Sequence, residues 1–103
     1  MVKNKILVID DEPEVVELLK KRLERVGYQV ITATDGMGGF KKACEQKPDL
    51  ILLDIIMSGV DGLTVLRRLR AEEATCDIPV IIVTAKGMTD SILEAQRYRA
   101  TDY

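Results

Sequence analysis

Three short apolar segments of this chain each end at side chains that carry oxygen. Residues 6–9 lead into Asp10 and Asp11, residues 50–53 lead into Asp54, and residues 80–83 lead into Thr84. If the segments are neighbouring parallel strands, their carboxyl ends lie at one edge of a sheet, where open α/β sheets bind ligands. The edge would then hold three carboxylates and a hydroxyl in a chain without histidine. These oxygen ligands favour a hard cation and a phosphoryl group.

Helical periodicity fills the stretches between the apolar segments. We expect strands at 5–10 and 29–34 and at two segments that end at Asp54 and Thr84, with helices at 13–26, 35–46, 63–73 and 89–99. The first helix shows its apolar face at Val15, Val16, Leu19, Leu23 and Val26. Pro13 suits the first helical position and Gly27 suits the stop. Strands that alternate with helices through short connections predict a parallel sheet covered on both faces.

Length and composition indicate one domain, residues 1–103, with a single core. The hydrophobic fraction of 47% and the charged fraction of 31% are ordinary for a globular protein. A net charge of -2 gives no general reason to bind nucleic acid or an anionic membrane. No apolar run approaches the ~20 residues of a membrane span, so we expect a cytoplasmic protein. Cys44 and Cys76 fit no metal-ligand spacing and are expected to be reduced thiols in or near helices.

The polar ends of the three strands resemble motifs of the receiver domain of two-component response regulators. The matching segments are Ile9-Asp10-Asp11-Glu12, residues 54–62 and Thr84-Ala85-Lys86, and residues 100–103 resemble the approach to a fifth strand. The resemblance covers the whole chain. It implies a doubly wound, flavodoxin-like sheet of order 2-1-3-4-5, in which Asp10, Asp11 and Asp54 meet at the switch point between strands one and three.

The resemblance also implies a role for each residue at this edge. Asp54 would accept a phosphoryl group from a phosphohistidine, becoming an aspartyl phosphate. Mg²⁺ would be held by Asp11 and Asp54, by Asp10 through water, and by the backbone carbonyl of Ile56. Thr84 would donate a hydrogen bond to the phosphoryl group, and Ala85 would leave space and an amide beside it. The implied partners are a sensor histidine kinase or phosphotransfer protein and a downstream effector or output domain.

Physical chemistry supports these roles independently of the family. A carboxylate can accept a phosphoryl group when the charge that develops during transfer is neutralised. Mg²⁺ prefers a few carboxylates together with retained water and phosphate oxygens, which this edge offers. Crowding raises carboxyl pKa values, but even a rise of ~2 units from near 4 leaves the groups ionised at pH 7. The empty cluster should therefore repel itself and attract a cation.

Structural interpretations of the same residues remain open. Asp10 and Asp11 could cap the helix that begins at Pro13, Asp54 could be a turn residue, and the hydroxyl of Thr84 could bond its own loop. The remaining polar candidates are expected to be structural or solvated: Asp61 as a helix cap, Glu12 as helix-start charge with metal-bound water as its alternative, and Lys86 facing solvent or a partner. Residues 36–39, Gly-Met-Gly-Gly, fit no phosphate-loop spacing and are interpreted as a weakened helix start.

The chain departs from the family pattern at two places. Ser58 stands where the family usually has proline, which should loosen that loop. The chain ends at Tyr103, before the expected fifth strand, so it lacks the lysine that contacts the phosphoryl group, and Lys86 follows the wrong strand to replace it. We therefore expect an incomplete receiver without its fifth strand and last helix. Strand four, then an exposed edge, and the face of the fourth helix are candidate dimer surfaces.

Two other functions compete with a phosphorylation switch that is not itself a turnover enzyme. The first is a receiver-like interaction module that no longer switches, which the absent lysine makes plausible. The second is a magnesium-dependent phosphohydrolase with an aspartyl nucleophile. Such enzymes commonly place a second aspartate two residues after the first, where this chain has Ile56.

Overall fold

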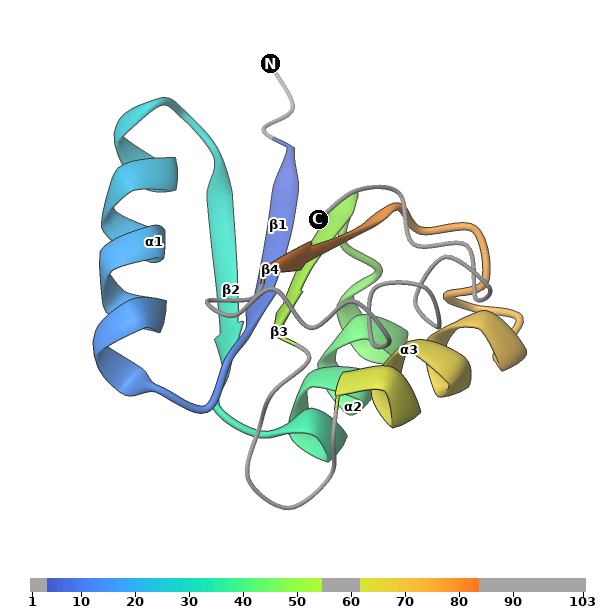
Figure 1. Cartoon of the computed structure of the whole chain (residues 1–103). Helices are drawn as coiled ribbons and strands as arrows, with labels where there is room; N and C mark the ends of the chain where they lie inside the picture. Colours follow the sequence, from blue (N-terminus) through green and yellow to red (C-terminus); the bar gives the residue numbers. More distant parts are fainter. Residues whose placement is uncertain (1–3, 55–61, 84–103) are drawn as a thin grey trace.

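The computed structural model describes residues 4–54 and 62–83 and shows alternating strands and helices (Figure 1). The elements are β1 (Lys5–Ile9), α1 (Pro13–Arg25), β2 (Gln29–Ala33), α2 (Gly36–Gln46), β3 (Leu50–Asp54), α3 (Gly62–Ala71) and β4 (Val80–Val83). Each expected strand and helix within these residues is present, with ends shifted by one or two residues. The helix expected at 89–99 lies outside the described residues.

The four strands form one parallel sheet of order β2-β1-β3-β4. This order agrees with the first four strands of the expected arrangement, and the chain reverses its direction of winding between β1 and β3. Ile9 lies opposite Ala33 of β2 and Leu53 of β3, while Asp54 lies opposite Val83 of β4. The carboxyl ends of the strands therefore reach the same edge, and Asp10 and Asp54 follow neighbouring buried residues there.

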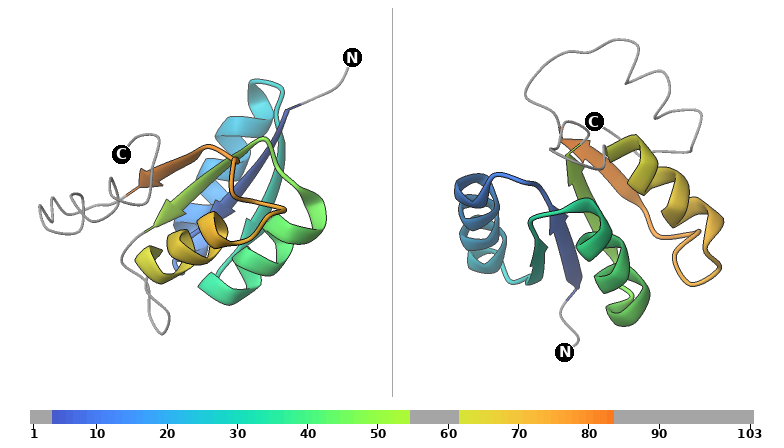
Figure 2. Two further views of the ribbon diagram at one scale, coloured as in Figure 1. Left: turned by 90° about the vertical axis from the view of Figure 1, so that its right-hand side faces the viewer. Right: turned by 90° about the horizontal axis from the view of Figure 1, so that it is seen from below.

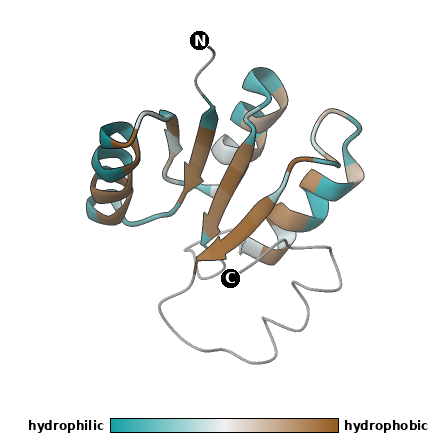
Figure 3. Ribbon diagram, turned by 90° about the horizontal axis from the view of Figure 1, so that it is seen from above, coloured by the Kyte–Doolittle hydropathy of each residue, from teal (hydrophilic) through white to brown (hydrophobic). Residues whose placement is uncertain are grey.

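Helices cover both faces of the sheet, with α1 on one side and α2 and α3 on the other (Figure 2). The larger core lies under α2 and α3, where Leu7, Ile9, Ile51, Leu53 and Ile82 of the strands pack with apolar side chains of both helices. The smaller core joins Val16 of α1 to Ile6 and Val8. The strands are apolar at consecutive positions, as expected for a parallel sheet with helices on both faces, and Figure 3 shows this for β1, β3 and β4.

Helix α1 begins and ends near the residues that the sequence indicates. Pro13 occupies the start of the helix, and Gly27 follows its end with φ of 104°, a conformation that glycine adopts without strain. Val26 was expected on the apolar face, but its side chain is 70% exposed. The expectation was wrong because the helix ends at Arg25, and Val26 is the capping residue with ψ of 7°, so it leaves the helical periodicity.

Helix α2 is capped by Asp35, whose Oδ1 accepts a hydrogen bond of 2.6 Å from the backbone N–H of Gly38. The glycines that follow were interpreted only as a weakened helix start, and that interpretation is incomplete. Gly36 and Gly39 are buried, and Gly39 packs directly on Ile9 of β1. The absence of a side chain at Gly39 lets the helix approach the sheet closely.

The connection from α3 to β4 is fixed by two polar side chains. The buried hydroxyl of Thr75 donates a hydrogen bond of 2.7 Å to the carbonyl of Leu69. Arg70 donates to the carbonyls of Cys76 and Ile78, at 3.1 and 2.6 Å. These bonds satisfy backbone groups of a non-helical segment and set the position from which β4 starts. Cys76 lies in this connection and Cys44 lies in α2, in agreement with the expected positions in or near helices.

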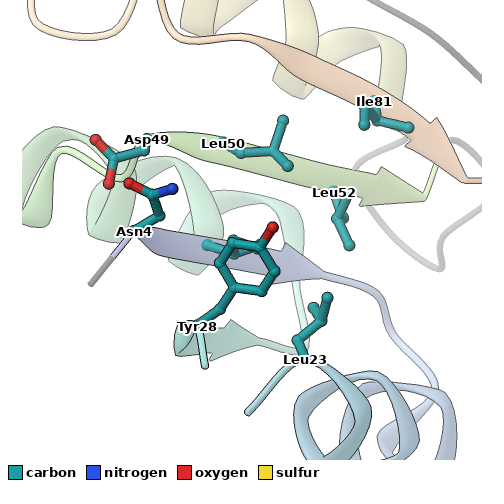
Figure 4. A pocket seen from close by; sticks show the side chains of 8 residues that line it. Asn4, Leu23, Tyr28, Asp49, Leu50, Leu52 and Ile81 are labelled. Atoms are coloured by element: carbon teal, nitrogen blue, oxygen red, sulfur yellow. The ribbon is translucent and has the colours of Figure 1, made fainter. Parts of the chain in front are cut away.

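An apolar hollow of about 410 Å³ lies on the α1 side of the sheet, away from its carboxyl edge (Figure 4). Its floor is formed by Ile6, Leu50, Leu52 and Ile81, with Leu23 and Tyr28 at one side and Asn4 and Asp49 at the amino ends of the strands. Among the helices that the structure describes, α1 alone packs on this face, over β1 and β2. The β3–β4 part of the face therefore remains half-exposed.

Candidate metal and phosphoryl site

Asp10 lies at the end of β1 and is held there by backbone hydrogen bonds on both sides. Its N–H donates to the carbonyl of Ala33 at 3.1 Å, and its Oδ1 accepts a bond of 2.9 Å from the N–H of Glu12. The second contact closes a local turn before α1 and does not cap the helix, because the capping residue is Glu12 and no side chain of the described residues caps the first turn. The first contact was not foreseen, because it depends on the register between β1 and β2.

Asp10, Asp11 and Asp54 meet at the carboxyl edge of the sheet. Each offers one carboxylate oxygen, and the three oxygens lie within 4.8 Å of one another. Asp10 is buried, while Asp11 and Asp54 are half-buried. Within residues 4–54 and 62–83, this is the one group of three or more acidic, histidine or cysteine residues close enough to hold a metal ion.

The other candidates are distributed around this cluster or lie outside the described residues. Glu12 is exposed and is not a member of the cluster, as its interpretation as helix-start charge predicts. Ile56, Asp61, Thr84, Ala85 and Lys86 lie outside the part of the chain that the structure describes. The roles that the resemblance implies for Ile56, Thr84 and Ala85 therefore stay predictions.

Burial raises the pKa of the Asp10 carboxyl above its ordinary value, and the neighbouring charge of Asp11 raises it further. The hydrogen bond from the N–H of Glu12 acts in the opposite direction and is weaker than the effect of burial. The folded state therefore holds a proton on Asp10 more tightly than the unfolded state does. This residue's contribution to stability is greatest below its unfolded pKa of ~3.9 and falls as pH rises through its raised folded pKa.

Asp10→Asn should consequently stabilise the metal-free protein at pH 7. The amide oxygen can still accept the bond from Glu12, but the buried charge is removed. We expect a gain on the order of 1 kcal/mol, or ~4–8 °C in Tm for a domain of this size, measured by thermal unfolding in a chelator. Glu12→Gln, at an exposed position, is the control and should shift stability by less than ~0.5 kcal/mol. A lower Tm for Asp10→Asn than for wild type would contradict the conclusion that the buried charge of Asp10 destabilises the metal-free protein.

The three carboxylates fit Mg²⁺ in ligand chemistry and in number. All are hard oxygen ligands, and three of them are fewer than the six that Mg²⁺ coordinates. An ion held this way keeps positions for water and for an oxygen of a second molecule. The cluster also brings like charges together at a partly buried edge, so a divalent cation relieves their repulsion.

Fold and site together define a doubly wound α/β domain with a cluster of three carboxylates at its switch point. The chain belongs to the response regulator receiver domain family, whose model matches residues 6–103. The matched residues include all three motifs at the ends of the strands, so the family match and the motifs agree.

Relatives of known sequence and structure support the assignment. The DNA-binding dual master transcriptional regulator RpaA of Synechocystis is 43% identical over 99 residues, which cover 96% of this chain and 41% of RpaA. Protein PilH of Pseudomonas aeruginosa is 39% identical over 99 residues, covering 96% of this chain and 82% of PilH. The receiver domain of the sensor histidine kinase PA1611 of the same species, solved with a magnesium ion coordinated in its active site cleft, is 27% identical with a TM-score of 0.89, covering 99% of this chain and 84% of that one.

The length that these relatives share with the chain differs widely. The chain spans less than half of RpaA, at 41% of its length, and most of PilH, at 82%. In the described residues no helix is both long and apolar enough to cross a membrane. The match therefore concerns the receiver domain, and what the complete protein does with it is a matter for proposal.

Proposed function

We propose that this domain is a phosphorylation switch in which Asp54 accepts a phosphoryl group with the help of Mg²⁺. The observation that carries the proposal is the cluster of Asp10, Asp11 and Asp54 at the carboxyl edge of the sheet, with their oxygens within 4.8 Å. The phosphoryl donor is a phosphohistidine on a sensor histidine kinase or a phosphotransfer protein. The family assignment and the position of the cluster at the switch point support this choice.

For the transfer the domain has to supply a nucleophile and to neutralise the charge that develops on the phosphoryl group. A carboxylate oxygen of Asp54 attacks the phosphorus, the P–N bond to histidine breaks, and a P–O bond forms. The electron pair of the broken bond returns to the imidazole, which is then protonated. Water later attacks the aspartyl phosphate and releases inorganic phosphate, which restores the carboxylate. The domain thus takes part in both reactions without being a turnover enzyme for an outside substrate.

The other two carboxylates prepare the site. Asp10 and Asp11, together with Asp54 and the backbone carbonyl of Ile56, would hold Mg²⁺, with Asp10 acting through water. The bound ion supplies positive charge that offsets the charge developing on the phosphoryl oxygens. Asp10 is suited to an indirect role, because its Oδ1 is already engaged by the N–H of Glu12. The half-buried Asp54 remains accessible to a donor.

We further propose that Thr84 and Ala85 convert the new phosphoryl group into a change of surface. Thr84 follows β4, whose last residue Val83 lies beside Asp54 in the sheet. Phosphoryl oxygens are strong acceptors, so a hydroxyl at this place would be drawn toward them and would repack its neighbours. Ala85 leaves room for the group beside it.

Thr84→Ala should therefore separate phosphorylation from its readout. We expect the variant to accept a phosphoryl group to nearly the wild-type extent, because Asp54 and the acidic cluster are unchanged. The phosphorylation-dependent amide shifts of residues 89–98, followed by NMR, should fall to a small fraction of their wild-type size. Shifts as large as in wild type would show that Thr84 does not transmit the signal.

The partners of the switch follow from the same proposal. An effector or an output domain would read the phosphorylated surface, and direct binding of nucleic acid by this domain is not expected from its net charge of -2. Dimer formation through β4 or the surface near residues 89–98, and a cytoplasmic location, stay predictions from the sequence.

A small-molecule donor tests the proposal without knowledge of the kinase. Acetyl phosphate with Mg²⁺ should add one phosphoryl group to the full-length protein, as measured by intact mass. The addition should be lost when Mg²⁺ is removed with a chelator. A wild-type protein that stays unmodified at saturating donor and Mg²⁺ would favour the interaction module that does not switch.

A further inference from the structure

Helix α2 approaches the sheet closely at Gly39. A Cβ atom placed on Gly39 would lie 2.6 Å from Cδ1, 2.7 Å from Cγ1 and 2.9 Å from Cγ2 of Ile9. Carbon atoms in good contact are ~3.5–4.0 Å apart, so the side chain of Ile9 occupies the space that a side chain at position 39 would need. The side chain of Ile9 fits in this space only because residue 39 is glycine.

Ile9 cannot yield this space freely. Its side chain is 0% exposed and belongs to the main core with Leu7, Leu53 and Ile82. Protein interiors are close-packed, so a displaced core side chain passes its displacement on to its neighbours. An added methyl group at position 39 would either push α2 outward or force Ile9 to move within β1.

A displacement of Ile9 would be transmitted directly to the acidic cluster. Asp10 is the next residue, and it is held by its N–H to Ala33 at 3.1 Å and by its Oδ1 to the N–H of Glu12 at 2.9 Å. These bonds leave little freedom to absorb a shift of the preceding residue. The three carboxylate oxygens lie within 4.8 Å of one another, and small misplacements of groups that hold a metal ion, directly or through water, are costly.

We propose that Gly39 is a positioning residue for the cation site, acting through Ile9 to place the Asp10 carboxylate. The glycine does not touch the site. It allows α2 to seat against the end of β1, so that Asp10 leaves the strand at the place where it meets Asp11 and Asp54. This inference rests on the proposed binding of Mg²⁺ to that cluster.

Mg²⁺ affinity of the full-length protein is the direct test, measured by calorimetric titration. Gly39→Ala should weaken Mg²⁺ binding roughly tenfold, the size of effect that groups supporting metal ligands commonly have. Gly38→Ala is the matched control, because it adds the same methyl group one residue earlier in α2. The three atoms nearest to its Cβ would all belong to the carboxylate of Asp35, at 3.0–3.3 Å, and that exposed side chain can shift, which weakens its cap on α2 but does not disturb Ile9. The control should therefore keep wild-type affinity.

A compensating substitution distinguishes the proposed route from general damage. Ile9→Val removes Cδ1, the Ile9 carbon nearest to the added methyl group, and leaves Cγ1 and Cγ2 at 2.7 and 2.9 Å from it, so it relieves part of the clash. We expect the double variant to recover part of the affinity that Gly39→Ala loses. If Gly39→Ala alone does not fold, the double variant should fold and bind Mg²⁺ more weakly than Ile9→Val alone, and equal affinity would overturn the role of Gly39.

The failures can be told apart. A wild-type protein that binds no Mg²⁺ overturns the proposed function. A wild-type protein that binds Mg²⁺, with a folded Gly39→Ala variant of equal affinity, overturns the role of Gly39. The role of Gly39 is also overturned if Gly38→Ala weakens Mg²⁺ binding as much as Gly39→Ala does. It is likewise overturned if Ile9→Val restores no affinity to Gly39→Ala, or if the double variant does not fold.

Discussion

Replacing Asp54 with asparagine should abolish phosphorylation of this protein. The amide fills the same space as the carboxylate, but it carries no charge and is too poor a nucleophile to attack phosphorus. In the structure Asp54 is the last residue of β3, half-buried and beside Asp10 and Asp11. Incubation of Asp54→Asn with acetyl phosphate and Mg²⁺ should leave its intact mass unchanged under conditions that modify the wild-type protein.

The strand that carries Asp54 also provides the control. Asp49 precedes the amino end of β3, is exposed, and uses Oδ2 to accept a bond of 2.8 Å from the N–H of Lys5. Asp49→Asn makes the same chemical change at the opposite end of the strand and should leave phosphorylation intact. Labelling of Asp54→Asn to the wild-type level would remove Asp54 as the acceptor and leave the cluster without its proposed chemistry.

Asp11→Ala should weaken Mg²⁺ binding far more than Glu12→Ala does. Asp11 contributes one of the three clustered carboxylate oxygens, whereas the adjacent Glu12 is exposed and lies outside the cluster. Loss of a ligand should lower the affinity at least roughly tenfold, since even groups that only support ligands have effects of ~10–100-fold. Glu12→Ala should change it by a small factor through long-range charge alone, and that factor should shrink as salt is added.

Calorimetric titration with Mg²⁺ at two salt concentrations measures both effects. The pair is well matched, because the two residues are neighbours and each substitution removes one negative charge. Equal losses in the two variants, both reduced by salt, would indicate a diffuse electrostatic effect. In that case the ion would be placed somewhere other than the cluster.

The sequence was sufficient for the arrangement of the sheet and for the membership of the cluster. Apolar strands that alternate with helical segments indicated a parallel sheet with helices on both faces, and the family resemblance implied the strand order that brings Asp10, Asp11 and Asp54 together. The parallel register makes this nearly unavoidable, because residues that end neighbouring parallel strands share one edge.

Features that depend on packing between distant segments could not be predicted. The exposure of Val26 follows from where α1 stops, which periodicity fixes only to within a residue or two. The close contact of Gly39 with Ile9 depends on how near α2 lies to β1. From the sequence alone, a glycine near the start of a helix indicates only a lower helix propensity. The raised pKa of Asp10 likewise comes from burial in the folded chain, which its neighbours in sequence do not determine.

Chemical trapping shows directly which residue carries the phosphoryl group, and we expect it to be Asp54. Wild-type protein is treated with acetyl phosphate and Mg²⁺ and then with borohydride, which reduces an aspartyl phosphate to homoserine with release of phosphate. Peptide mass mapping then locates the converted residue. We expect homoserine at position 54, and none when Mg²⁺ is withheld. Conversion of a different aspartate, or conversion at position 54 that does not depend on Mg²⁺, would contradict this expectation.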